Sequence, residues 1–198
     1  RLDDTFLDPK VFNKNSLIGV PGLFKCWKKG NVGIINALGT GVADDKAVYS
    51  YVNKMIVYYL GEQPILNQVE TFLCEDKVHR QHVIENISKL VVKPANASGG
   101  YGIMIGPKAP KKERDDVIKK IKKNPRDFVA QPLEILSTTP TISENGIEPR
   151  HLDLRPFILS GKQTYVTVGG LTRVALKRGS TVVNSSQGGG SKDTWVID

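Results

Sequence analysis

A lysine at the end of a short apolar run, followed by a glycine-rich reversal, is the feature of this sequence best suited to chemistry. Val91-Val92-Lys93 leads into a loop of small residues at 95–102, and Ile103-Met104-Ile105 follows as a second apolar run. This order predicts a fixed cation beside a row of backbone N–H donors, an arrangement that suits a polyphosphate. The glycines permit close approach of a ligand and positive φ angles. The segment matches neither a Walker A motif nor a Gly-x-Gly-x-x-Gly fingerprint, so an ordinary hairpin loop stays open as the alternative.

Asp153, Arg155 and Arg173 form a second candidate group. Asp153 and Arg155 occupy alternate positions of a predicted strand, so they point to the same face of it. Arg173 interrupts the apolar pattern of a later predicted strand at 171–176. Two arginines that face one cleft would stabilise the charge that develops during phosphoryl or acyl transfer. The alternative is a surface pair, which would contribute little to stability.

Two further segments could border a site. Residues 128–133 read as a strand that runs into a proline-containing linker, where Gln131 and backbone amides could meet a flat purine edge. An edge-strand exit is the alternative. Residues 184–193 have the composition of a flexible linker, but the apolar Trp195-Val196-Ile197 follows soon after. A short mobile loop over a site is therefore equally open.

The elements that must position these residues predict an α+β fold, because helices come first and hairpins later, unlike a doubly wound parallel sheet. Apolar residues at helical spacing predict helices from an Asp44 cap to Gly61, over 77–88, and within 108–126, where Pro125 ends the pattern. Short apolar runs and period-two alternation predict the strands. They cover residues 32–36, 90–92, 103–105, 128–130, 153–159, 164–168, 171–176 and 181–184.

The charge of the chain is concentrated in one segment. The 198 residues carry 28 Lys and Arg against 20 Asp and Glu, a net charge of +8. Most of the excess lies in residues 108–126, which hold nine basic and three acidic side chains. Because no aromatic residues are interleaved there for base stacking, the pattern favours a solvated surface helix over a nucleic-acid contact.

Other features of the composition indicate a cytoplasmic protein. No stretch of about 18 consecutive apolar residues and no basic-apolar-small leader is present, so no membrane span is predicted. Cys26 and Cys74 lie far apart, which predicts free, reduced thiols. His79 and His82 have no further ligand types beside them, and no metal site is predicted. The sequence starts at Arg1 and has a strand-like pattern close to its end, which predicts that it is a piece of a larger protein.

The order and spacing of these windows resemble the ATP-grasp superfamily, and most closely its circularly permuted branch related to glutathionylspermidine synthetase. The resemblance covers most of the chain. It rests on Asn-Ala-Leu-Gly-Thr-Gly-Val-Ala-Asp-Asp-Lys at 36–46, Val-Val-Lys-Pro at 91–94 with Ser-Gly-Gly-Tyr-Gly at 98–102, Ala-Gln-Pro at 130–132, Arg-His-Leu-Asp-Leu-Arg-Pro-Phe at 150–157, Gly-Gly-Leu-Thr-Arg-Val-Ala-Leu at 169–176 and Val-Asn-Ser-Ser-Gln-Gly-Gly-Gly at 183–190.

The resemblance implies that ATP lies between two small lobes with antiparallel sheets and flanking helices. Arg155 and Arg173 would then steady the transferring phosphoryl group and the acyl phosphate, and Asn184 with the loop after it would help to hold the substrate. Two lysines would hold the phosphates or the adenine edge, the glycine loop would close over the β- and γ-phosphates, and the strand exit would form an adenine hinge. In that order, these nucleotide-binding residues are Lys46, Lys93, Ser98, Gly99, Gly100, Tyr101, Gly102, Gln131 and Leu133.

The resemblance also implies a division into parts. Residues 1–60 would be a leading segment with a helix that borders the nucleotide cleft, 61–130 the nucleotide-binding lobe, and 131–198 an incomplete second lobe. Enzymes of this superfamily normally carry Mg²⁺ ligands as an Asp and a later Glu-x-Asn, but no Glu-x-Asn follows Arg173. In the permuted branch that acidic strand is expected upstream of Arg1, so the main Mg²⁺ ligands are expected outside this chain.

The activity that the resemblance implies is an ATP-dependent carboxylate–amine ligase acting through an acyl phosphate, with this chain as its nucleotide-binding part. Its carboxylate and amine substrates would be small molecules or peptides. Alone, the chain is expected to bind ATP weakly and to turn over little or nothing. A catalytically inactive binding module with the ATP-grasp fold is the alternative.

Overall fold

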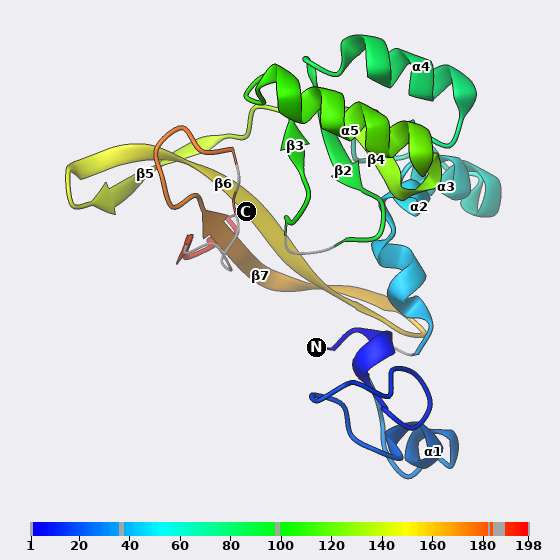
Figure 1. Ribbon diagram of the computed structural model, residues 1–198. Helices are drawn as coiled ribbons and strands as arrows, with labels where there is room; N and C mark the ends of the chain where they lie inside the picture. Colours follow the sequence, from blue (N-terminus) through cyan, green and yellow to red (C-terminus); the bar gives the residue numbers. More distant parts are fainter. Residues whose placement is uncertain (1, 36–37, 98–99, 182, 184–188, 198) are drawn as a thin grey trace.

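The computed structural model describes residues 2–35, 38–97, 100–181, 183 and 189–197, and it has an α+β architecture (Figure 1). Two antiparallel sheets of four strands each are joined by the linker 133–137. Figure 1 shows helices packed on the first sheet, and the second sheet as a long twisted ribbon running below it. The expected fold class is confirmed.

The first sheet carries its helices on one face. Its strand order is β1-β4-β2-β3, and the helices are α4 and α5. Apolar residues of both helices and of the sheet share one core, which includes Val83, Ile87, Val92, Met104 and Ile121. The bounds are β1 Phe72–Leu73, α4 Lys77–Asn86, β2 Leu90–Pro94, β3 Met104–Ile105, α5 Lys111–Lys123, η3 Pro125–Asp127 and β4 Phe128–Pro132.

Strand alternation places the candidate residues of this sheet away from the helices. Val92 pairs with Ala130 and Met104, and all three belong to the helix-side core. Lys93 follows Val92 in β2, and Gln131 follows Ala130 in β4. Both side chains therefore project from the face of the sheet opposite the helices. The predicted strand–loop–strand unit and the two helices are confirmed, with α4 capped by Asp76, whose carboxylate accepts from the backbone N–H of His79 at 2.8 Å.

The second sheet has the strand order β5-β6-β7-β8. Its bounds are β5 Thr138–Ser143, β6 Gly146–Ser160, β7 Thr164–Val174 and β8 Gly190–Lys192. The two strands predicted at 164–168 and 171–176 form the single strand β7, because Gly169 adopts a φ of 109° and Gly170 lets the chain pass close to β6. A Cβ at Gly170 would lie 2.8 Å from the backbone oxygen of Arg155. The strand predicted at 181–184 is wrong for Thr181 and Val183, which are irregular, while its other two residues lie outside the described residues.

The leading part of the chain consists of short helical segments. They are η1 Asp4–Phe6, α1 Leu23–Lys28, η2 Thr40–Asp44, α2 Lys46–Tyr49 and α3 Val52–Leu60. The predicted strand at 32–36 is wrong over its described residues 32–35, which are irregular. The buried carboxylate of Asp8 organises this region instead, since it accepts hydrogen bonds from the backbone N–H groups of Lys10, Gly22 and Phe24.

The helix predicted from Asp44 to Gly61 is divided in two. Its cap is Asp45 rather than Asp44, because the Asp45 carboxylate accepts from the N–H of Ala47 at 2.8 Å. The Ser50 hydroxyl donates to the carbonyl of Ala47 and interrupts the regular helical bonds before α3 starts. Gly61 ends α3 with a φ of 66°, as predicted. No helix within the described ranges combines the length and apolar composition needed to cross a membrane.

The two cysteines are free, and we expect them to differ in reactivity. Cys26 is exposed, whereas Cys74 is fully buried, and burial raises the pKa of its thiol to about 11. At neutral pH its thiolate is therefore about 100-fold scarcer than that of a thiol with the usual pKa of 9.0. Alkylation of the folded protein, followed by mass spectrometry, should label one thiol, and two in denaturant. A Cys26→Ser variant should show no labelling while folded, and rapid labelling of that variant would contradict the buried position of Cys74.

Candidate functional site

A hollow of about 480 Å³ lies where the leading segment, the glycine loop and the second sheet meet. It brings together Lys46 at the start of α2, Gly100 and Tyr101 of the loop, and Arg155 of β6. These four predicted site residues come from three separate parts of the chain. The rest of the described lining is Asp3, Gly41, Val42, Asp44, Asp45, Pro94, Asn96, Ala97 and Ile103.

Lys46 is fixed at the rim of the glycine loop. Its backbone N–H donates to the carbonyl of Ala95 at 2.8 Å, and its Nζ donates to the carbonyl of Ala97 at 2.5 Å. Burial lowers the pKa of Lys46 below its usual value, although the charges of Asp45 and Asp44 act in the opposite direction. The ammonium therefore lies in partly desolvated surroundings beside the loop.

Gln131 holds Lys93 on the face of the first sheet opposite α4 and α5. Its Nζ donates to Gln131 Oε1 at 2.6 Å, and Gln131 Nε2 donates to the hydroxyl of Thr71 at 2.8 Å. Burial lowers the pKa of Lys93, and the positive charge of Lys46 lowers it further. Two ammonium groups thus lie within electrostatic reach of each other, and an anion placed near both would relieve that repulsion.

Gln131 is nearly fully buried, at 8% exposed, and both ends of its amide are engaged by Lys93 and Thr71. The adjacent Pro132 ends β4, and Leu133 begins the linker to the second sheet in a half-buried position. In this arrangement the Gln131 side chain orients Lys93. The adenine hinge formed by Gln131 and Leu133 stays a prediction.

The glycine loop needs its glycines for its shape. Gly100 and Gly102 adopt φ angles of 78° and 72°, in the left-handed region. A Cβ on Gly102 would also lie 2.9 Å from Pro94 Cγ. Ser98 and Gly99, named in the prediction for this loop, lie outside the described residues, as does Asn184.

Asp153 binds both candidate arginines. Arg173 lies opposite it on β7 and donates from Nε to Oδ1 at 3.0 Å and from Nη2 to Oδ2 at 2.6 Å. Arg155 donates from Nη2 to Oδ2 at 3.1 Å, which confirms that Asp153 and Arg155 share one face. Burial would raise the pKa of Asp153, but the hydrogen bonds from Arg173 and Arg155 hold it below its usual value.

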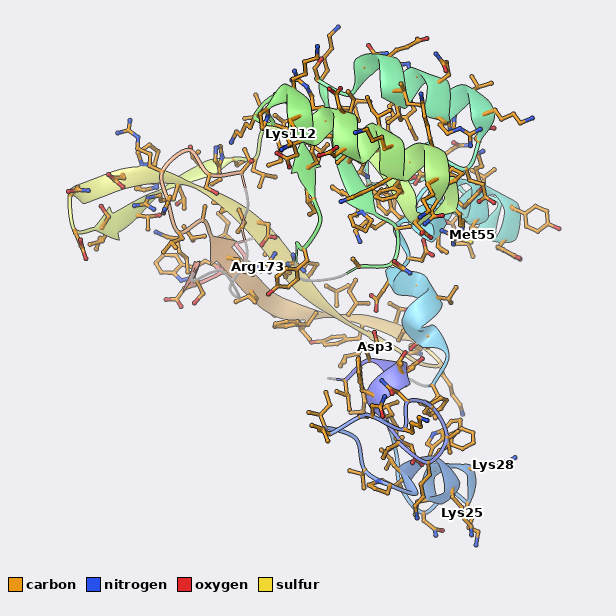
Figure 2. The ribbon with its side chains drawn as sticks, in the orientation of Figure 1. Asp3, Lys25, Lys28, Met55, Lys112 and Arg173 are labelled. Carbon is orange, nitrogen blue, oxygen red and sulfur yellow. The ribbon has the colours of Figure 1, made fainter. Side chains whose placement is uncertain are left out.

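The two arginines differ in exposure. The side chain of Arg173 is 14% exposed and that of Arg155 is 52% exposed. Arg155 lines the hollow, whereas Arg173 is not among its described lining residues. Figure 2 shows Arg173 on β7, below β3 in this view. Arg155 is therefore the arginine that shares the hollow with Lys46, and Arg173 is placed to hold the carboxylate that orients Arg155.

The described residues do not enclose a metal site by themselves. Within the described ranges, no group of three His, Cys, Asp or Glu side chains could hold a metal ion. Asp153, the acidic residue on the candidate face of β6, has both oxygens bound by arginines. We therefore assign no step to Mg²⁺ through these residues.

Thr71, Asp45 and Arg126 support the site through side-chain contacts, and none of the three was predicted from the sequence as a site residue. Thr71 anchors Gln131, and Asp45 forms an ion pair with Arg126 at 2.8 Å. Asp45 is adjacent in sequence to the predicted site residue Lys46, and this adjacency was a local signal that Asp45 lies near the site. Arg126 had no such signal, because it lies 81 residues away from its partner.

The fold agrees with what comparisons to known proteins show. The chain belongs to the family described as circularly permuted ATP-grasp type 2, whose profile matches residues 1–175. The resemblance predicted from the motifs is thereby confirmed.

The similarity to curated relatives covers all or nearly all of the chain. It is 54% identical over all 198 residues to uncharacterized protein sll0335 of Synechocystis sp., of which it covers 41%. It is 52% identical over the same length to uncharacterized protein Rv2411c of Mycobacterium tuberculosis, of which it covers 36%. A Frankia casuarinae protein named "Putative glutamate--cysteine ligase 2-2" is 45% identical over 99% of this chain, which covers 22% of that protein. The chain thus spans about two fifths or less of the length of these relatives.

Proposed function

We propose that this chain is the nucleotide-binding part of an ATP-dependent carboxylate–amine ligase that acts through an acyl phosphate. The observation that carries the proposal is the shared hollow, where Lys46, the glycine loop and Arg155 converge, with Lys93 within electrostatic reach of Lys46. Family membership supports ATP as the ligand. The ligase name of the Frankia relative supports peptide-like bond formation, with small-molecule or peptide carboxylates and amines as substrates.

Each residue has a role in this proposal. Lys46 and Lys93 neutralise the phosphates, and the backbone of Ser98, Gly99, Gly100, Tyr101 and Gly102 covers them. Gln131 and Leu133 border the adenine. A substrate carboxylate oxygen attacks the γ-phosphorus, ADP leaves, and the amine then attacks the acyl carbon as phosphate departs. Arg155, held through Asp153 and Arg173, balances the charge that develops on the transferring group. Asn184 helps to hold the substrate.

The proposal keeps the division of the chain into three parts. Residues 1–60 would border the nucleotide, 61–130 would form the nucleotide-binding lobe, and 131–198 would supply part of the second lobe. Mg²⁺ would be held mainly by residues beyond those described. When bound, it would supply charge neutralisation between the phosphates.

Titration of the chain with ATP and Mg²⁺, followed by NMR of the backbone amides, tests the proposal. We expect saturable shifts of Gly100 and Tyr101, since both line the hollow, and small shifts for the exposed tip of the second sheet around Ile142. Inorganic phosphate in a parallel titration measures generic anion binding. No selective shift of the loop with ATP would exclude the proposed site. If the chain binds ATP but the whole protein releases no phosphate from ATP in the presence of amine substrates, the inactive binding module would be favoured.

A further inference from the structure

The start of α2, the end of β2 and η3 meet at a junction beside the two lysines. The N–H of Lys46 donates to the carbonyl of Ala95, and the N–H of Ala95 donates to the carbonyl of Asp127, both at 2.8 Å. Arg126 Nη2 donates to Asp45 Oδ2, also at 2.8 Å. Each of the three elements is therefore bonded to the other two, and the side-chain bond is the one between Arg126 and Asp45.

The carboxylate of Asp45 is divided between two tasks. Oδ1 accepts from the N–H of Ala47 and caps α2, while Oδ2 accepts from Arg126. The Asp45 side chain is only 17% exposed, and burial would raise its pKa. The hydrogen bonds from Arg126 and Ala47 instead hold that pKa below its usual value, so the carboxylate is ionised at neutral pH.

An ionised carboxylate directly before Lys46 could compete with a bound phosphate. Asp45 already acts on the charge of Lys46. α2 is a single turn of four residues, so it has little intrinsic ability to keep its direction. If Arg126 did not hold Oδ2, Asp45 could turn toward the ammonium of Lys46 and neutralise it.

We propose that Arg126 is a positioning residue for the nucleotide site: by holding Asp45, it fixes the start of α2 and keeps the ammonium of Lys46 available to phosphate. This inference rests on the proposed function. It extends that function to a residue outside the hollow, since Arg126 is not among the described lining residues.

A set of variants separates this role from simple stabilisation. Arg126→Ala should weaken ATP binding about tenfold, the scale of one lost charged contact, and Arg126→Lys should recover part of it. Arg126→Ala with Asp45→Asn should bind ATP better than Arg126→Ala alone, because Asn keeps the helix cap but cannot neutralise Lys46. The matched control is Lys122→Ala, which removes an exposed cation of α5 and should leave binding within about twofold.

A second readout needs no nucleotide. NMR titration of the Lys46 side chain should show a raised pKa in Arg126→Ala, because Asp45 then pairs with Lys46, and no rise in Lys122→Ala or in the double variant. Equal ATP affinity of Arg126→Ala and the wild type, or equal weakening in the single and double variants, would overturn the inference. If the wild type binds no ATP, the proposed function is wrong. If the pKa of Lys46 is unchanged in Arg126→Ala, the positioning role of Arg126 is wrong, whatever the outcome for the proposed function.

Discussion

Replacing Lys93 by methionine is expected to weaken ATP binding on the order of 30-fold, because a charged hydrogen bond contributes about 2 kcal/mol. Methionine keeps most of the volume of the side chain and removes its charge. Calorimetric titration with ATP and Mg²⁺ measures the effect. Lys89→Met, at the exposed position just before β2, is the matched control and should bind ATP as the wild type does. Wild-type affinity in Lys93→Met would contradict the role assigned to this lysine.

Stability should respond much less to the same substitution. The folded-state pKa of Lys93 is lowered, chiefly by burial and then by the charge of Lys46, so holding its ammonium at neutral pH costs stability. Removal of the charge relieves this cost but leaves the buried Gln131 Oε1 without its donor, so the melting temperature should stay close to that of the wild type. A loss of ATP binding without a loss of stability distinguishes a ligand-binding charge from a structural one.

The pH dependence of binding follows from the same shift. A bound phosphate favours the protonated lysine, so ATP binding takes up a proton once the pH exceeds the lowered pKa of Lys93. The affinity should therefore fall as the pH rises toward the ordinary lysine pKa of 10.5, and the fall should begin below that value. Lys93→Arg keeps its charge across this range and should reduce the alkaline loss.

Asp153→Asn is expected to lower the free energy of unfolding by about 2 kcal/mol, because Arg173 and Arg155 would lose their shared anionic acceptor and face each other unpaired. Chemical denaturation at neutral pH measures this loss. Asp116→Asn removes a carboxylate from an exposed pair with Lys119 at 3.2 Å and should cost less than about 0.5 kcal/mol. Equal stability of Asp153→Asn and the wild type would show that the pairing contributes nothing.

The stability of the protein at acid pH should also depend on the Asp153 carboxylate. The pKa of Asp153 in the folded state is lowered, so its contribution is present above the unfolded value of 3.8 and is lost as the pH falls through the folded pKa. The Asp153→Asn variant should lack this loss. Arg155 should also be displaced from the hollow, which would weaken phosphoryl transfer in the whole protein more than ATP binding.

Where the sequence failed on the fold, a longer-range contact decided the outcome. β5 was not among the predicted strands; it is an edge strand, and an edge strand tolerates its Pro140 opposite Pro149. The prediction placed a break between two strands at Gly169 and Gly170, but this pair is the place where the continuous strand β7 passes close to Arg155. The break was wrong because a pair of glycines has a different meaning once the neighbouring strand is known.

The sequence by itself determined the chemistry that is available: the lysine at the end of β2, the glycine loop, the arginines of β6 and β7, and the helices that support the first sheet. Those features depend on residue type and on spacing within one segment. Only the tertiary structure decided which charges meet, since Gln131 reaches Lys93 across 38 positions and Arg126 reaches Asp45 across 81. It placed Arg155 in the hollow with Lys46 and set Arg173 behind Asp153. The physical reason is that such contacts follow from strand register and from the packing of distant segments, which no local pattern specifies.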